Sequence, residues 1–258
     1  SYLLNRLNPV SSFFFGPDSS LYGLLHTAKK EDATQAVLIC PPIGAAYKKC
    51  YFLLKLLGDE LAEAGIPVLR FDYYATHDSM GEDQEASFDQ WRSDIQCAYQ
   101  ELQERTGAEI TVLGIRMGAL LALRSLAEKD VKKWVLWDPV YSGNSYYQEL
   151  MNMQKRKVWR SRTVRGYSKP MAEGNGVELI GFTYSDTAVK EMQTISADDL
   201  QLKSDAKVFH IHTKDIITDQ DTHSWQQLLD SKICDVDVNC AWLDPVELTT
   251  TIIDKKIL

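Results

Sequence analysis

The stretch Ile110-Thr111-Val112-Leu113-Gly114-Ile115-Arg116-Met117-Gly118 decides the fold. Its first four residues form an apolar, β-branched run that predicts a short buried strand, and residues 118–129 have the apolar spacing of a helix. The two predicted elements are joined by a short turn that has glycine at both ends and arginine at its centre. A strand that passes so abruptly into a helix is typical of the repeating unit of an α/β protein.

Strands and helices alternate on both sides of this unit. Apolar runs predict strands at 36–40, 68–72, 134–137, 207–212 and 234–238, and helical spacing predicts helices at 51–64, 87–105, 222–229 and 246–257. Residues 13–26 predict an antiparallel hairpin that turns at 17–20. We therefore expect a mostly parallel central sheet with helices on both faces, in a single domain over residues 1–258. The alternation breaks at 141–204, a polar stretch that we expect to be irregular.

Composition and charge exclude several classes of protein. A net charge of −8 and a pI near 5.2 argue against general nucleic-acid binding. No apolar run approaches the roughly 20 residues that span a bilayer, and residues 1–11 lack the pattern of a signal peptide. The five cysteines are irregularly spaced and form neither a disulfide framework nor a metal-binding pattern. We expect a cytoplasmic protein without metal or cofactor, which binds neither nucleic acid nor membrane.

Several motifs follow one another in order: Cys40-Pro41-Pro42-Ile43-Gly44, then Leu69-Arg70-Phe71-Asp72-Tyr73-Tyr74-Ala75-Thr76-His77-Asp78-Ser79-Met80-Gly81, Trp91-Arg92-Ser93-Asp94, the turn at Arg116, Leu136-Trp137-Asp138-Pro139 and Ala241-Trp242-Leu243-Asp244-Pro245. Together they resemble the α/β-hydrolase superfamily. The likeness is to its serine-aminopeptidase-like branch and to the hydrolases associated with exosortase systems and biosynthetic clusters. It covers the chain from Ser20 onward, weakly at 141–204. The resemblance implies an α/β-hydrolase fold with a nucleophile elbow at Arg116 and a cap insertion at about 141–204.

The resemblance also assigns the parts of a serine hydrolase site. It implies oxyanion-hole amides at Ile43 and Met117, and an acid at Asp215 or, alternatively, at Asp138. The nucleophile position holds Arg116, which has no usable lone pair at neutral pH. The family's histidine base follows the last strand, where residues 239–244 contain no histidine. We therefore do not expect an ordinary serine hydrolase.

Arg116 has two interpretations. A cation at the start of a helix is unfavourable unless an anion neutralises it. One interpretation is an internal salt bridge to Asp215 or Asp138 that fills the site. In the other, Arg116 and the amides of Ile43 and Met117 hold a carboxylate, enolate or phosphate of a ligand.

Four other residues are candidates for the site. His77 stands where the family has a small residue, and is either an acid/base over the pocket or a surface residue. Cys40 is either a substitute thiol nucleophile or a small buried hydrophobe. Tyr74 and Asp72 follow a strand's carboxyl end, where they are positioned to line the site. We expect Asp72 to hold the loop in place.

A basic run lies within residues 141–204. Lys155, Arg156, Lys157, Arg160, Arg162, Arg165 and Lys169 follow one another without an intervening acid. The run is either a solvated loop or a landing patch for an acidic partner, such as a carrier protein or a phosphorylated cofactor arm.

Three functions remain open. The first is an enzyme that acts without an acyl-enzyme on a small-molecule or carrier-linked acyl or peptidyl intermediate, stabilising an oxyanion with Arg116 and backbone amides. The second is a non-catalytic binding or partner protein, and the third is a hydrolase or acyltransferase with a displaced nucleophile. The recognisable oxyanion turn and acid positions favour the first.

Overall fold

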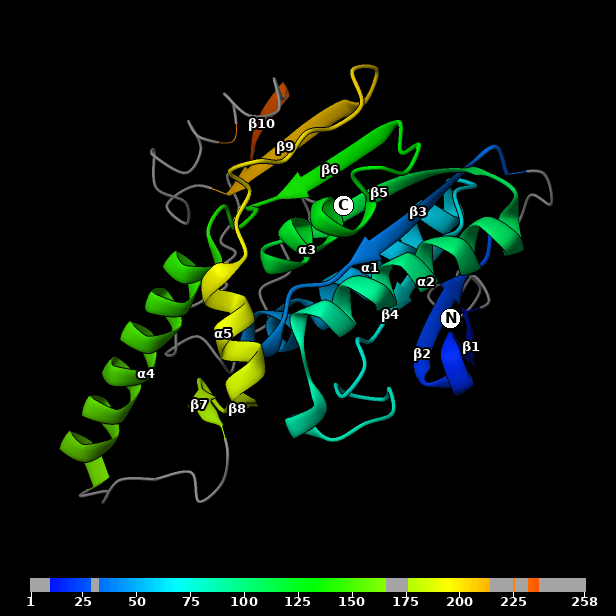
Figure 1. Ribbon diagram of the computed structural model, residues 1–258. Helices are drawn as coiled ribbons and strands as arrows, with labels where there is room; N and C mark the ends of the chain where they lie inside the picture. Colours follow the sequence, from blue (N-terminus) through cyan, green and yellow to red (C-terminus); the bar gives the residue numbers. More distant parts are fainter. Residues whose placement is uncertain (1–9, 29–32, 166–175, 214–224, 226–231, 237–258) are drawn as a thin grey trace, which may run out of the picture.

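A computed structural model describes residues 10–28, 33–165, 176–213, 225 and 232–236. Its centre is an eight-stranded sheet in the order β1-β2-β4-β3-β5-β6-β9-β10 (Figure 1). The strands are β1 Val10–Phe15, β2 Leu21–His26, β3 Gln35–Cys40, β4 Val68–Phe71, β5 Glu109–Ile115, β6 Lys133–Trp137, β9 Lys207–Thr213 and β10 Lys232–Val236. β2 runs antiparallel to β1 and to β4, and the pairs from β4 to β10 are parallel. The predicted hairpin and mostly parallel sheet are therefore confirmed.

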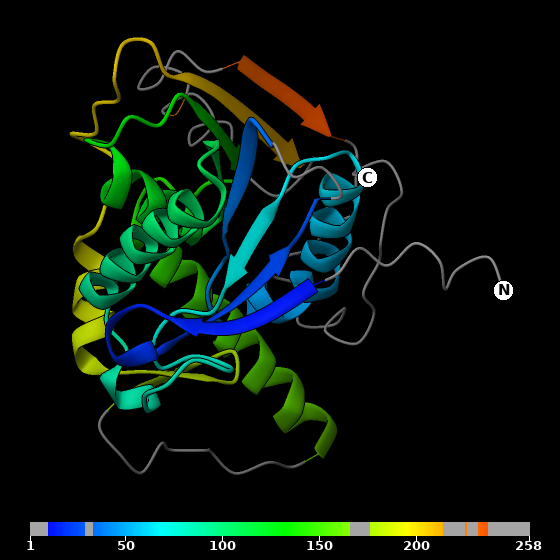
Figure 2. The ribbon, with the colours of Figure 1, turned by 90° about the vertical axis from the view of Figure 1, so that its right-hand side faces the viewer.

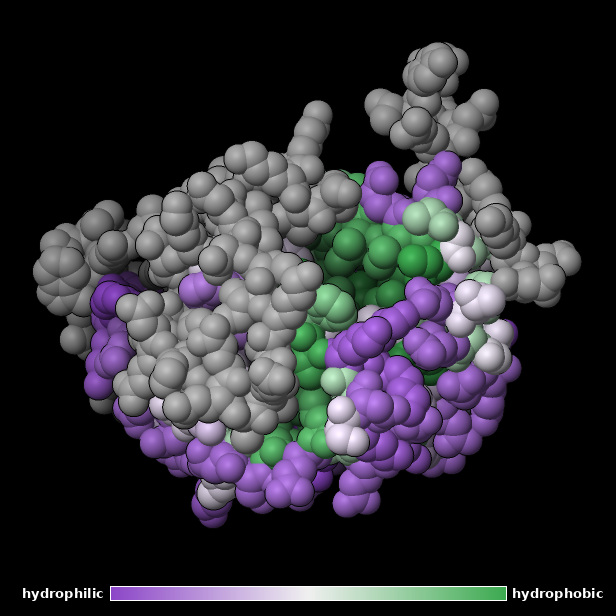
Figure 3. All heavy atoms as spheres, turned by 90° about the horizontal axis from the view of Figure 1, so that it is seen from above, coloured by the Kyte–Doolittle hydropathy of each residue, from purple (hydrophilic) through white to green (hydrophobic). Residues whose placement is uncertain are grey.

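Helices cover both faces of the sheet, as predicted. α1 (Gly44–Glu63) lies on one face, and α2 (Phe88–Thr106) and α3 (Met117–Leu126) lie on the other (Figure 2). Each face has its own apolar cluster, and on the α1 side Val135 and Ile211 of β6 and β9 are only partly buried. Seen from above, an area of apolar side chains also reaches the surface beside polar ones (Figure 3). None of the helices in the described part of the chain has the length and apolarity needed to cross a bilayer.

Local residues explain both ends of α2 but not the start of α1. The hydroxyl of Ser87 accepts the N–H of Gln90 and caps α2, which ends at Gly107 in the left-handed conformation (φ 62°). Both ends agree with the prediction. α1, in contrast, begins at Gly44 and not at residue 51, because the buried side chains Ala45, Ala46, Tyr47 and Cys50 extend its inner face. The helices predicted at 222–229 and 246–257 lie outside the described residues, apart from Trp225.

The segment between β6 and β9 is more regular than predicted. It contains α4 (Gly143–Arg165), the hairpin β7 (Val177–Leu179) and β8 (Phe182–Tyr184), and α5 (Asp186–Thr194). The prediction of an irregular stretch was wrong for these residues. Within residues 143–157, whose side chains the structure describes, the fully buried side chains of α4 form a narrow stripe of Tyr146, Leu150 and Met153, which is a weak helical signal among many polar residues. The segment lies at the end of the sheet toward which the arrows of β6 and β9 point (Figure 1).

A buried histidine links α1 to the antiparallel edge of the sheet. Nε of Arg70 donates to Nε2 of His26 (2.9 Å), so the proton of the neutral imidazole lies on Nδ1, which donates to Asp59 (2.8 Å). Burial and the charge of Arg70 lower the pKa of His26, although Asp59 acts in the opposite direction. The folded protein therefore holds His26 in its neutral form.

This neutral histidine predicts a loss of stability in mild acid. Below about pH 6.5, His26 in the unfolded chain takes up a proton, whereas His26 in the folded protein stays neutral. The free energy of unfolding therefore decreases as the pH is lowered. We expect the stability advantage of the wild type over His26→Gln to shrink on acidification, by at most about 1.4 kcal/mol per pH unit. Urea unfolding of both proteins at about pH 7.5 and pH 5.5 measures this. An advantage of the same size at both pH values would contradict it.

Candidate functional site

The turn between β5 and α3, residues 114–118, holds its central residue in a rare backbone conformation. Arg116 has φ 52° and ψ −123°, a region that costs a non-glycine residue of order 1–3 kcal/mol. A Cβ on Gly118 would overlap the carbonyl oxygens of Pro41 and Cys40, and one on Gly114 would overlap the backbone of Ala119. The turn is thus pressed against residues 40–42, and the start of α3 at Met117 lies beside the turn that carries Ile43.

The side chain of Arg116 is buried and bonded within the protein. Nη2 donates to the carboxylate of Glu149 on α4 (3.1 Å), and Nη1 donates to the backbone carbonyl of Asp138 (3.3 Å). Among the described residues, Nε has no hydrogen-bond partner. The guanidinium lies 5.6 Å from the ring centre of Tyr146. Arg116 is 4% exposed and its partner Glu149 is partly exposed, so the ion pair ties the buried elbow turn to the surface helix α4.

The carboxylate that pairs with Arg116 is not one that the sequence suggested. We expected Asp138 or Asp215, and the structure shows Glu149. Asp138 contributes its carbonyl oxygen, while its own carboxylate accepts the N–H of Thr213 (2.7 Å). Asp215 lies outside the described residues. Glu149 was missed because it belongs to α4, which was not predicted.

Removing Glu149 should destabilise the fold. A buried guanidinium that loses its carboxylate costs about 3–5 kcal/mol in a closed interior, and because Glu149 is 38% exposed we expect about 2 kcal/mol for Glu149→Ala. The double variant Arg116→Met with Glu149→Ala should recover most of this loss, since the buried charge is then gone. Urea unfolding of the four proteins of the cycle measures the coupling. Equal stability of Glu149→Ala and the exposed control Glu128→Ala would contradict it.

A cavity of about 300 Å³ opens beside the elbow turn, at the carboxyl ends of β3 and β4. Its walls are the turn at 41–44, the loop that follows β4, and the β7–β8 hairpin. Gly44 has φ 56°, and a Cβ there would overlap the hydroxyl of Tyr184, so the hairpin is seated directly on the turn. Aromatic side chains form much of the wall: Tyr47, Tyr73, Trp91, Phe182 and Tyr184.

Asp72 fixes the loop that borders this cavity. The hydroxyl of Tyr47 donates to one of its oxygens (2.6 Å) and the N–H of Asp78 to the other (3.2 Å). Its backbone carbonyl accepts from the hydroxyl of Ser79 (2.7 Å). Burial raises the pKa of Asp72, although the bonds from Tyr47 and Asp78 lower it. The buried carboxyl therefore both holds the loop, as expected, and lines the cavity.

His77 is an exposed residue of this loop, and it also lines the cavity. Its backbone is left-handed (φ 46°), and its ring centre lies 4.4 Å from that of Tyr47. Desolvation lowers the pKa of His77, whereas Asp72 and Asp78 raise it, and the net shift is downward. At neutral pH His77 is therefore an uncharged base beside a buried carboxyl, within reach of a ligand.

Two side chains of α2 hold the loop from behind. The N–H of Tyr74 donates to Asp94 (2.8 Å), and the indole N–H of Trp91 donates to the carbonyl of Tyr74 (3.0 Å). Burial raises the pKa of Asp94 to about 6. His77 thus sits on a loop bonded at both ends, which limits its movement.

Not every predicted site residue reaches the cavity. Ile43 and His77 line it, while Met117 is buried at the start of α3. Tyr74 was predicted to line the site, but its ring packs on Gly81 and its hydroxyl bonds to Glu85 (3.2 Å); its neighbour Tyr73 lines the cavity instead.

Cys40 is fully buried at the end of β3. Burial raises the pKa of its thiol, which favours the interpretation of Cys40 as a small buried hydrophobe over that of a substitute nucleophile.

Among the cavity residues that sequence reasoning missed are five aromatic ones: Tyr47, Tyr73, Trp91, Phe182 and Tyr184. Trp91 belongs to a motif that marked the region. Tyr47 fell outside the predicted helix, and Phe182 and Tyr184 belong to a three-residue strand too short for a periodic signal.

Comparison with solved structures identifies the fold of the chain. No family model and no curated sequence matches the chain. Solved structures do match. Est1E of Butyrivibrio proteoclasticus with bound ferulic acid matches with a TM-score of 0.64 and 17% sequence identity, over 88% of this chain and 91% of that one. The α/β hydrolase GrgF of Penicillium sp. sh18 matches with a TM-score of 0.64 and 16% identity, over 93% of this chain and 94% of that one. Mouse α/β hydrolase domain-containing protein 10 also matches, with a TM-score of 0.56 and 16% identity over 92% of this chain and 94% of that one. The chain therefore has the α/β-hydrolase fold.

Proposed function

We propose that this protein is an α/β-hydrolase-fold enzyme that transfers a proton on a bound ligand without forming an acyl-enzyme. The ligand is a small molecule or a carrier-linked acyl or peptidyl intermediate, held in the cavity beside the elbow turn. The observation that carries the proposal is the meeting of His77, Asp72 and Tyr47 on one cavity wall. Titratable groups with shifted pKa values in a cavity are the usual mark of acid–base chemistry.

The elbow turn supports chemistry other than acyl transfer. In serine hydrolases the residue on this strained strand-to-helix turn is the nucleophile. We infer that Arg116 replaces that serine, in a chain derived from the serine-aminopeptidase-like branch. Its guanidinium is committed to Glu149 and to the carbonyl of Asp138, so Arg116 acts as a structural tie. In this proposal the backbone amides, and not Arg116, bind the anion that the sequence analysis assigned to both.

The proton step follows from the positions of the groups. Neutral His77 removes a proton from the carbon next to a ligand carbonyl, the C–H electron pair forms a C=C bond, and the C=O pair moves onto the carbonyl oxygen. The N–H of Ile43, on the cavity wall, donates to that oxyanion. The carboxyl of Asp72 stabilises the imidazolium that forms. Return of the proton to a different atom or face completes an isomerisation or epimerisation.

A ring-opening reaction tests this function without knowledge of the natural ligand. Nitrobenzisoxazole is a small aromatic molecule that loses one proton to a base, and the C–H electron pair forms a nitrile while the N–O bond breaks to a coloured phenolate. We expect the protein to accelerate this reaction and to remain unlabelled by a fluorophosphonate. No acceleration over free imidazole would overturn the proposal. Stoichiometric fluorophosphonate labelling at one site would instead establish a displaced nucleophile.

One observation favours a second candidate, a non-catalytic binding protein. The Arg116–Glu149 ion pair closes the elbow turn, where a reacting group would otherwise stand. A protein that binds ligands in the cavity and fails to accelerate the ring opening would have this second function.

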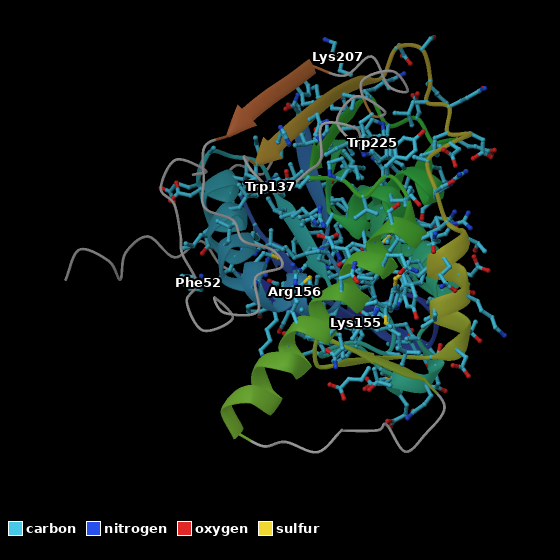
Figure 4. The ribbon with its side chains drawn as sticks, turned by 90° about the vertical axis from the view of Figure 1, so that its left-hand side faces the viewer. Phe52, Trp137, Lys155, Arg156, Lys207 and Trp225 are labelled. Carbon is cyan, nitrogen blue, oxygen red and sulfur yellow. The ribbon has the colours of Figure 1, made fainter. Side chains whose placement is uncertain are left out.

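The basic run suggests a partner for either function. α4 is helical through Arg165, so this part of the run is not the loop that was one of its two interpretations, and Lys169 lies outside the described residues. Lys155 and Arg156 are exposed on α4 (Figure 4). We propose that this surface receives an acidic partner such as a carrier protein, by charge complementarity.

A further inference from the structure

The geometry points to a specific class of ligand: a small aromatic molecule that carries a cationic or neutral hydrogen-bond donor, and not a carboxylate or phosphate. This inference rests on the proposed function only in taking the cavity as the ligand site. It follows from the charge, the side chains and the size of the cavity.

The charge of the cavity wall is negative. Asp72 and Asp83 line it, and no lysine or arginine is among its described lining residues. The loop that borders the cavity, residues 72–85, contains five acids and no lysine or arginine. Lys157 of α4 approaches the rim, with its ammonium 3.7 Å from where a Cβ on Gly181 would stand. A wall dominated by carboxylates raises the local concentration of cations and repels anions.

The aromatic wall suits the same ligand. The rings of Tyr73 and Trp91 pack in a tilted arrangement with centres 5.6 Å apart, and the hydroxyl of Tyr184 lies against Gly44 of the turn at 41–44. Aromatic rings attract a flat apolar ligand through their faces and edges, and they attract an ammonium through the negative charge of their faces. Rings and carboxylates in one cavity therefore select a ligand with an aromatic body and a donor group.

The size of the cavity limits the ligand. A volume of about 300 Å³ is at the low end for ligand sites. It corresponds to roughly ten water volumes of about 30 Å³ each. A single ring with a short side chain fits these dimensions.

Three probes of one shape and different charge test the inference on the full chain. We expect 2-phenylethylammonium to bind at least about tenfold more tightly than phenylacetate, which is about 1.4 kcal/mol, with 2-phenylethanol between them. Calorimetric titration or ligand-observed NMR at neutral pH measures the three affinities. Asp83→Asn should reduce the preference for the cation about twofold or more, and Asp72→Asn should remove most of it. Glu104→Gln changes an exposed acid near the end of α2, close to the amino end of β5 and away from the cavity at the carboxyl ends of β3 and β4, and should leave the preference unchanged.

The outcomes separate this inference from the proposed function. Tighter binding of phenylacetate, a preference that survives in both aspartate variants, or no binding of any probe at roughly 10 mM would each overturn the inference. A charge preference without ring opening would leave the inference standing and remove the proton chemistry. Ring opening together with a preference for phenylacetate would support the proton chemistry and overturn the inference about the ligand.

Discussion

Gly118→Ala is expected to lower the free energy of unfolding by about 3 kcal/mol or more. The new Cβ would stand 2.8 Å from the carbonyl carbon of Pro41 and would overlap the oxygens of Pro41 and Cys40. These are backbone atoms at the end of β3, which lies within the sheet, so they cannot move aside as a side chain can. Either α3 or the turn at 41–44 must shift, and the cavity wall shifts with it.

Urea unfolding followed by tryptophan fluorescence measures this loss. Gly107→Ala is the matched control, because a Cβ there meets open space and carries only the cost of its left-handed backbone, about 1 kcal/mol. A Gly118→Ala protein as stable as Gly107→Ala would show that the elbow turn is not pressed against residues 40–42.

His77→Gln is expected to slow the ring opening of nitrobenzisoxazole about 100-fold, at the lower end of what a positioned base contributes. Glutamine keeps a polar group of similar length and cannot take up the proton. The loop itself should persist, because its bonds run through Asp72, Ser79 and Asp94 and do not involve the imidazole. Equal rates in the wild type and His77→Gln would remove His77 from the mechanism.

Asp72→Asn separates positioning from base chemistry. Asparagine keeps an acceptor for the hydroxyl of Tyr47 but loses the charge that stabilises a protonated His77. We expect a smaller loss of rate than in His77→Gln, and no loss in the distant control Glu104→Gln. A loss in all three variants would point to general destabilisation.

The elements that the sequence predicted well have strong local signals. The run from Ile110 to Gly118 gave the strand, the turn and the helix, because apolar periodicity and paired glycines depend on neighbouring residues alone. The ends of α2 were right because Ser87 and Gly107 act within one turn of the helix.

The parts that the sequence did not predict depend on distant contacts. Glu149 becomes the partner of Arg116 only when α4 packs over the elbow turn, and the two residues are far apart in the chain. Tyr184 reaches Gly44 from a three-residue strand. Tyr73 and Tyr74 are neighbours, and bonds to residues distant in the chain fix their orientation: the hydroxyl of Tyr73 donates to the carbonyl of Pro41, and Asp94 and Trp91 bond to the backbone of Tyr74.

The most direct test of proton transfer by His77 is the pH dependence of kcat/KM for the ring opening. Because partial desolvation at the cavity holds the pKa of His77 below its usual value of about 6.5, the base form predominates at neutral pH. The rate should rise through a midpoint below about 6.5 and then stay level, and Asp72→Asn should move the midpoint lower, since Asp72 raises this pKa. A rate that climbs steadily with hydroxide concentration, or a profile that is the same in His77→Gln, would contradict proton transfer by His77.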